Sequence, residues 1–261
     1  MIVNADDFGF TRDVNEGIIA AHRDGILTAA TLMANGAAFD HAVGLARQTP
    51  SLDIGCHLVL VGGSSLLTGH PFPASVPQLL VEIGLGRMAI YDELAAQVRQ
   101  ILLARVAPSH LDTHKHTHLA PRVFDAVVRI ARDFQIPWVR KPFDFSAVPG
   151  TPFATRVANY GMGLMRGRFN RSLAGLRMSD HFAGFQLTGH LRTENLVRTL
   201  RGLPDGLTEF MCHPGYCGVE LQAAPTRLRA SRAVELTALT SVAAREALLE
   251  KKARLVNYRE L

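Results

Sequence analysis

Residues 1–9 read Met-Ile-Val-Asn-Ala-Asp-Asp-Phe-Gly, an apolar run that leads into two adjacent carboxylates. A short apolar run bounded by turn residues is typical of a buried strand. Similar runs follow at residues 28–34, 53–60, 109–114, 138–141 and 207–212, with amphipathic helical stretches between them. This alternation predicts repeated strand–helix units and a parallel sheet.

The number of these units indicates the fold class. Seven or eight strand–helix units in 261 residues favour an α/β fold of the irregular (β/α) barrel type, TIM-barrel-like and incompletely closed, over an open doubly wound sheet. The first strand is not followed by Gly-x-Gly-x-x-Gly, which argues against dinucleotide binding. We find no break in composition, no linker and no internal repeat, so we expect residues 1–261 to form a single domain.

Two further stretches carry expectations about local structure. Residues 62–87 are polar and contain several Gly and Pro, which predicts a long connection of the kind that often serves as a lid or binding loop. Residues 254–258 predict a final strand.

The composition is that of a folded protein with little charge bias. Hydrophobic residues make up 48% and charged residues 20% of the chain, and the formal net charge is +5. Such a small excess predicts no nucleic-acid binding, and no apolar run is long enough to predict a membrane span. The first residues lack the pattern of a signal peptide and the 3 cysteines are an odd number, so we expect a cytoplasmic location.

Polar side chains follow several of the predicted strands where each strand ends. They are Asp6 and Asp7, His57, the segment 110–118, and His213. Because the carboxyl ends of parallel strands share one face of the sheet, we expect these side chains to lie close together.

The adjacent carboxylates Asp6 and Asp7 point to opposite faces if the strand stays extended. One carboxylate could bind a cation while the other stays beside it as a base, because the cation holds both ionised. Alternatively, the two acids cap a turn before Gly9.

The segment 110–118 holds four of the 11 histidines. Period-two alternation places Asp112, His114, His116 and His118 on one face for as long as the strand lasts. Imidazole and carboxylate ligands suit a divalent metal, although the spacing does not decide which imidazole binds. The alternative is a solvated polar loop with a helix cap.

Single polar residues at strand ends allow two interpretations. His57 ends an apolar strand beside other polar strand ends, which favours a ligand over a core histidine. His213 could act as a general acid or base, or hydrogen-bond a turn. Cys212 and Cys217 bracket His213, but too few thiols are present for a structural zinc site, so we interpret them as small buried residues.

One basic stretch lies in the middle of the chain. Its arginines are Arg156, Arg166, Arg168, Arg171 and Arg177. Such a run is usually a solvated helix face, and less often the rim of a site for a polar or anionic substrate.

Several of these motifs together resemble the YdjC-type carbohydrate deacetylases, and they span nearly the whole chain. The matching stretches are Asn4–Gly9, Thr28–Met33 with Asn35-Gly36, Gly55–Leu58, His110–His118, Cys212–Gly215 and Arg254–Arg259. Cys56 and Thr113 depart mildly from the family pattern, and residues 145–177 show little that aligns, which leaves the acetylated sugar undefined.

The resemblance implies an irregular barrel of the NodB type, one divalent metal and N-deacetylation of a small carbohydrate with release of acetate. Position by position, it implies that Asp7, His57 and His114 are metal ligands. It also implies that Asp6 is the catalytic base and His213 the catalytic acid. The family implies magnesium, whereas two imidazoles and one carboxylate suit zinc by ligand type. No organic cofactor is implied, and a homodimer is one assembly that the sequence permits.

Two other functions compete with this interpretation. Barrel metallohydrolases of the phosphoesterase or amidohydrolase type also use His-x-His at a strand end, usually with more ligands. A non-catalytic metal- or nucleic-acid-binding protein would rely on the arginine stretch.

Overall fold

The computed structural model describes residues 1–145, 153–164, 166–167, 169 and 175–261. Within these residues, seven strands form one sheet in the order β5-β4-β3-β2-β1-β7-β6. Every neighbouring pair is parallel. The strands are β1 (Ile2–Phe8), β2 (Ala29–Leu32), β3 (Asp53–Leu58), β4 (His110–Thr113), β5 (Trp138–Val139), β6 (His181–Ala183) and β7 (Thr208–Cys212).

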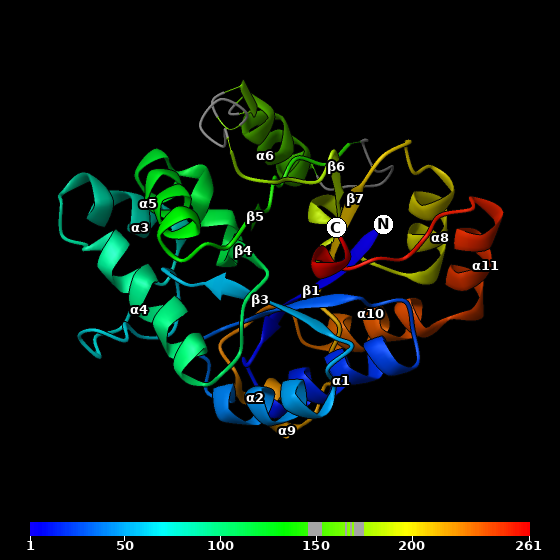
Figure 1. Cartoon of the computed structure of the whole chain (residues 1–261), viewed down its shortest axis with the longest axis horizontal. Coiled ribbons are helices and arrows are strands. Elements are labelled where there is room, and N and C mark those ends of the chain that lie inside the picture. Colours follow the sequence, from blue (N-terminus) through cyan, green and yellow to red (C-terminus); the bar gives the residue numbers. More distant parts are fainter. Residues whose placement is uncertain (146–152, 165, 168, 170–174) are drawn as a thin grey trace.

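Helices surround this sheet, which curls into a half-barrel (Figure 1). They are α1 (Arg12–Arg23), α2 (Phe39–Gln48), α3 (Val76–Gly84), α4 (Ile90–Leu103), α5 (Pro121–Asp133), α6 (Phe153–Leu164), α8 (Thr193–Arg201), α9 (Val219–Ala223), α10 (Ala230–Thr240) and α11 (Val242–Glu250). Short 3-10 helices span His114–Leu119, Phe185–Leu187 and Tyr258–Glu260.

The predicted irregular barrel is confirmed. The edge strands β5 and β6 do not pair with each other in the described part of the chain, and isolated bridges join Trp138 of β5 to Arg177 and Phe182 of β6 to Asp144. The central strands β1, β2 and β3 are buried along their whole length, as expected for parallel strands that are covered on both faces. The curled sheet therefore gathers the carboxyl ends of its strands on one side.

The connection over residues 62–87 is not a loop throughout, because it contains helix α3. The Ser75 side chain accepts a hydrogen bond from the Gln78 backbone and caps this helix, and a proline occupies its first turn. Leu79 and Ile83, one turn apart, are buried. The preceding residues are of the types that favour turns, and for this reason the short amphipathic helix after them was not predicted.

The predicted final strand at residues 254–258 is wrong. This segment contacts the sheet at the backbone of Met1, where Met1 N donates to Arg254 O (2.6 Å) and Val256 N donates to Met1 O (3.0 Å). Its direction then changes, because the Asp53 carboxylate accepts a hydrogen bond from the Tyr258 backbone (2.9 Å) and a 3-10 helix follows. The chain ends near its start (Figure 1).

Among the helices that the structure describes, none combines the length and the apolar character that crossing a bilayer would need.

Candidate metal and catalytic centre

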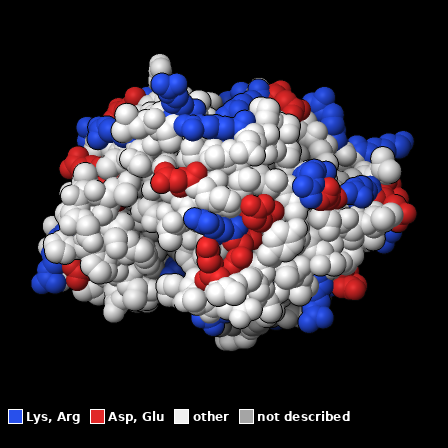
Figure 2. Space-filling model, turned by 90° about the horizontal axis from the view of Figure 1, so that it is seen from below, with Lys and Arg blue, Asp and Glu red and all other residues white. Residues whose placement is uncertain are grey.

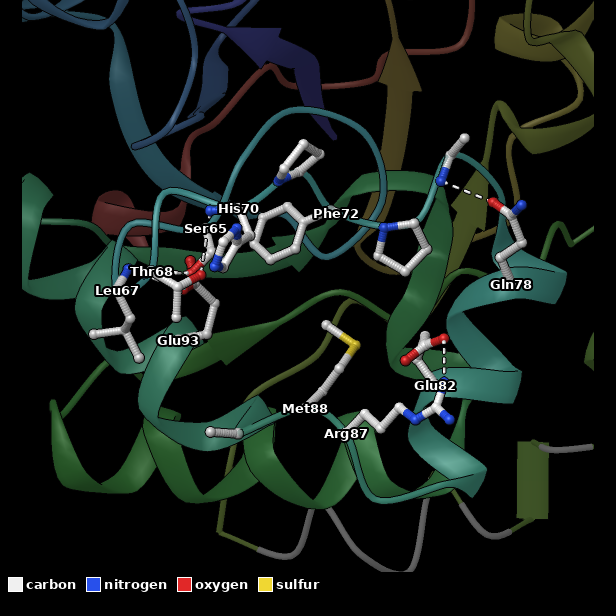
Figure 3. A pocket seen from close by; sticks show the side chains of 14 residues that line it. Ser65, Leu67, Thr68, His70, Phe72, Gln78, Glu82, Arg87, Met88 and Glu93 are labelled. Carbon is white, nitrogen blue, oxygen red and sulfur yellow. Dashed lines mark hydrogen bonds and ion pairs between the residues drawn. The ribbon is translucent and has the colours of Figure 1, made fainter.

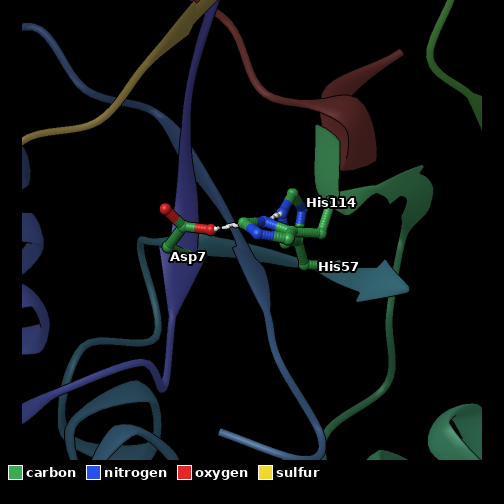
Figure 4. A group of neighbouring side chains, drawn as sticks. All are labelled: Asp7, His57 and His114. Carbon is green, nitrogen blue, oxygen red and sulfur yellow. Dashed lines mark hydrogen bonds and ion pairs between the residues drawn. The ribbon is translucent and has the colours of Figure 1, made fainter. Parts of the chain in front are cut away.

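The carboxyl ends of β1, β3, β4 and β7 bring the predicted site residues together. Asp7 lies near the end of β1 and His57 near the end of β3, while His114 and His213 directly follow β4 and β7. The register pairs His57 with Asp112 across β3 and β4. Figure 4 shows Asp7, His57 and His114 pointing toward one another from separate segments.

Three potential ligand atoms converge at this point. Asp7 Oδ1 lies 3.3 Å from His57 Nε2 and 3.1 Å from His114 Nδ1, and the two ring nitrogens are 3.2 Å apart. Ligands bound at roughly 2.0–2.2 Å to one cation lie about 3.0–3.5 Å from each other. One oxygen and two imidazole nitrogens at these separations could therefore hold a divalent metal ion.

The His57 ring is oriented by a carboxylate behind it. Its Nδ1 lies 2.7 Å from Asp112 Oδ1, and Thr31 Oγ1 donates to Asp112 Oδ2 (3.0 Å). A hydrogen bond from Nδ1 to Asp112 leaves the Nε2 lone pair directed at Asp7, the arrangement common for metal-binding histidines. Burial lowers the pKa of His57, but Asp112 and Asp7 outweigh it and raise the pKa to about 10. The surroundings therefore favour a positive charge here, which a proton or a metal cation would supply.

A backbone irregularity places Asp7 in the centre. Its φ is 68°, in the left-handed region, and the β1–β2 register shifts between Ala5 and Phe8. Asp6 and Asp7 therefore do not diverge to opposite faces, as an extended strand predicts, and both carboxylates enter the same polar cluster. Burial opposes ionisation of Asp7, but Arg232, His114 and His57 lower its pKa well below the usual value.

Asp6 is held in a fixed orientation by Arg140. Arg140 donates from both terminal nitrogens, at 2.8 Å to Asp6 Oδ2 and 2.7 Å to Asp6 Oδ1. Asn4 Nδ2 donates to Oδ1 as well, and His213 Nε2 lies 4.0 Å from Oδ2. Burial opposes ionisation, but Arg140, His57 and His213 lower the pKa of Asp6. This carboxylate is ionised and pre-aligned at neutral pH.

Arg140 is a central residue that the sequence interpretation missed. It directly follows β5, its side chain is fully buried, and it also contacts Asp112 Oδ2 (2.6 Å) and Glu209 Oε1 (2.6 Å). Its position near the end of the strand predicted at residues 138–141 was the available signal, by the same strand-end rule that identified the histidines. A second trio of potential ligands, Asp6, His57 and Asp112, is less suited to a cation because Arg140 already occupies both carboxylates.

His213 lies beside Asp6 in a buried position. Its backbone N donates to Glu235 Oε2 (2.6 Å), and its Nδ1 has no partner among the described residues. Burial lowers the pKa of His213 to about 4, so the ring is neutral near pH 7. A role as proton donor therefore requires that the ring first gain a proton.

His116 and His118 do not share a face with His114, contrary to the period-two prediction. Strand β4 ends at Thr113, and the backbone then turns through Lys115 (φ 54°) and His116 (φ 50°). The ring of His116 lies 5.5 Å from that of Phe185, and the ring of His118 lies 5.5 Å from that of Phe169. Both histidines are buried among aromatic side chains.

The arginine stretch forms no cluster in the part of the chain that the structure describes. Arg156 and Arg166 are exposed, Arg177 stacks on Trp138 at 4.4 Å from the ring centroid, and Arg168 and Arg171 lie outside the described residues. On the face shown in Figure 2, basic and acidic side chains are interspersed. Cys212 is buried, as predicted, whereas Cys217 is half-buried.

A separate hollow of about 570 Å³ lies between the segment after β3 and helices α3 and α4 (Figure 3). Phe72 and Met88 give it apolar walls. Glu93, at its edge, already accepts hydrogen bonds from Ser65 Oγ (2.6 Å) and Gln97 Nε2 (2.9 Å). The hollow shares no lining residue with the Asp7–His57–His114 centre.

The sequence and the fold both match known proteins. A family model described as YdjC-like protein matches residues 1–250. A protein from Brevibacillus brevis named carbohydrate deacetylase is 33% identical over 273 residues, which cover 100% of this chain and 99% of that protein. A protein of the same name from Geobacillus stearothermophilus is 32% identical, with 99% and 96% covered.

A crystal structure from Enterococcus faecalis, described as that of a cellobiose-phosphate cleavage protein, has a TM-score of 0.78 and 25% identity. The superposition covers 99% of this chain and 97% of that one. With a matching family model over nearly the whole length and full-length relatives above 30% identity, this chain belongs to the YdjC-like protein family.

Proposed function

We propose that this protein is a metal-dependent carbohydrate deacetylase that removes N-acetyl groups from an amido sugar or an N-acetylglucosamine oligosaccharide. The observation that carries the proposal is the convergence of Asp7, His57 and His114 beside a second carboxylate, Asp6, that is held by Arg140. The full-length relatives named carbohydrate deacetylase support the reaction class.

In this proposal Asp7, His57 and His114 hold one divalent cation. Such a cation supplies Lewis acidity, which polarises an amide carbonyl and lowers the pKa of water. Magnesium agrees with the family resemblance and zinc with the imidazole ligands.

Asp6 is the proposed base. Arg140 fixes both of its oxygens, and this pre-alignment reduces the reorganisation needed when a proton arrives from the attacking water. The low pKa keeps Asp6 ionised at neutral pH, which is the state that a base requires.

His213 is the proposed donor to the leaving amine. Because the ring is neutral at pH 7, it needs the proton that Asp6 has taken from water. Its Nε2 lies 4.0 Å from Asp6 Oδ2, close enough for a transfer after a small movement. The proton then passes to the amine nitrogen as the carbon–nitrogen bond breaks, which gives acetic acid and the free amine. These ionise in neutral water to acetate and an ammonium group, and both residues return to their starting states.

The test is acetate release from N-acetylglucosamine and its oligomers, with metal content measured on the same preparation. Asp6→Asn should keep the metal content of the wild type and lower kcat by about 10²–10⁴-fold, as expected for loss of a general base. Asp24→Asn makes the same chemical change at an exposed ion pair with Arg23 and should leave kcat unchanged.

Two outcomes would contradict different parts of the proposal. Acetate release by Asp6→Asn at the wild-type rate would show that Asp6 is not the base. A metal-loaded wild-type protein that releases no acetate from any sugar in the panel would contradict the reaction class.

A further inference from the structure

Helix α10 contacts the centre through two buried residues one turn apart. Arg232 and Glu235 are each 1% exposed, although charged side chains on a helix of this length usually face solvent. Their spacing of three residues places them on one side of the helix. Neither belongs to a motif that the sequence interpretation used.

Arg232 holds the oxygen of Asp7 that faces away from the histidines. Its NH2 group donates to Asp7 Oδ2, whereas Oδ1 is the atom that faces His57 and His114. The guanidinium is itself fixed, because Nε donates to Leu228 O (3.2 Å). A carboxylate held this way offers one oxygen, not two, to the centre.

Glu235 holds the segment that carries His213. Its Oε2 accepts a hydrogen bond from His213 N (2.6 Å), and its Oε1 accepts one from Gly189 N (3.3 Å). The backbone of the same helix contributes as well, since Arg232 O accepts a hydrogen bond from Gly215 N (3.3 Å). The turn after β7 is therefore tied to α10 at two points.

We propose that α10 positions both parts of the centre independently: Arg232 fixes Asp7 as a one-oxygen ligand, and Glu235 fixes His213 beside Asp6. Both are positioning residues, and the inference rests on the proposed function because it assumes a cation at Asp7. Partners that orient a metal ligand typically contribute about 10–100-fold to metal affinity.

The experiment separates the two roles by measuring Co²⁺ affinity calorimetrically alongside kcat and KM. Arg232→Met should bind Co²⁺ about 10–100-fold more weakly than the wild type. Arg232→Lys keeps one donor and should lose between about twofold and tenfold, a partial rescue. Glu235→Gln should keep Co²⁺ affinity within about twofold while kcat falls by about tenfold or more at little-changed KM.

Arg201→Met is the matched control, because it removes an exposed arginine paired with Glu250, and its Co²⁺ affinity and kcat should match the wild type. Equal loss of Co²⁺ affinity in Arg232→Met and Glu235→Gln would overturn the proposal, since α10 would then act only by packing. Unchanged affinity in Arg232→Met would also overturn it; if that variant does not fold, unchanged affinity in Arg232→Lys has the same meaning. A wild-type protein that binds no Co²⁺ would instead overturn the metal site itself.

Discussion

His114 and His116 are two residues apart and lie in opposite environments. The His114 side chain is 24% exposed and faces the carboxylate of Asp7. His116 is 8% exposed and packs against the rings of Phe182 and Phe185. Residues of one type in one short motif thus divide between a polar centre and an aromatic core.

The difference arises from two backbone angles. Both Lys115 and His116 are in the left-handed region, which non-glycine residues rarely occupy, and the chain reverses there instead of continuing β4. Contacts that are remote in sequence hold this turn, including the packing of His118 against Phe169. An imidazole is a suitable metal ligand wherever it occurs, but the backbone conformation decides whether it reaches the other ligands.

The comparison is tested most directly by replacing one histidine of the polar centre and one histidine of the aromatic core. His57→Gln should remove Co²⁺ binding and lower acetate release by ~10³-fold or more, because the cation supplies several kcal/mol of charge stabilisation. His116→Gln should change Co²⁺ affinity by less than about twofold, or ~0.4 kcal/mol. Calorimetric titration checks both, and equal losses in the two variants would contradict the division.

The next prediction concerns the stability that Arg140 gives to the polar centre. Arg140→Met leaves the buried carboxylates of Asp6, Asp112 and Glu209 without their shared cation. We expect a loss of about 3–5 kcal/mol in the free energy of unfolding, the usual cost of breaking a buried ion pair. Urea denaturation of the variant and the wild type measures it. A loss below ~1 kcal/mol would mean that the carboxylates are satisfied without Arg140.

Buried neutral histidines on both sides of the comparison should be recognisable by how the stability of the protein responds to acid. Burial lowers the pKa of His118 to about 3 and that of His213 to about 4, below the usual value of about 6.5. Between about pH 6.5 and 4 the unfolded chain therefore binds protons that the folded protein does not. The free energy of unfolding should therefore decrease as the pH is lowered, by up to ~1.4 kcal/mol per pH unit for each such histidine.

Urea denaturation at several pH values between 7 and 4 checks this slope. His118→Gln should make the slope shallower, since one buried neutral imidazole is lost. An identical slope in variant and wild type would show that His118 titrates normally in the folded protein.

The fold was largely predictable from the sequence, and the errors of the prediction have local causes. Apolar runs marked the strands because a parallel sheet covered on both faces needs them, as in β1 and β3. Helix α3 was missed because the Ser at its N-cap and the Pro in its first turn also suit loops. The last segment has the composition of a strand but meets the sheet at only a few backbone groups near Met1.

The part of the candidate centre that lies at the ends of strands was predictable from the sequence. Asp7, His57 and His114 come together as the strand-end rule expects. Arg232 and Glu235 could not be found this way, because they lie on a helix and more than 200 residues separate Arg232 from Asp7. Nothing local marks a helical arginine as buried.

By itself, the sequence determined the kind of fold and the chemical groups available to the centre, because apolar periodicity and residue type are properties of the chain. Only the tertiary structure decided which histidines face Asp7, which carboxylates Arg140 holds, and how α10 contacts Asp7 and the segment of His213. Those choices depend on backbone angles at Asp7 and Lys115 and on contacts between distant segments. They emerge only when the sheet curls and its strand ends share one face.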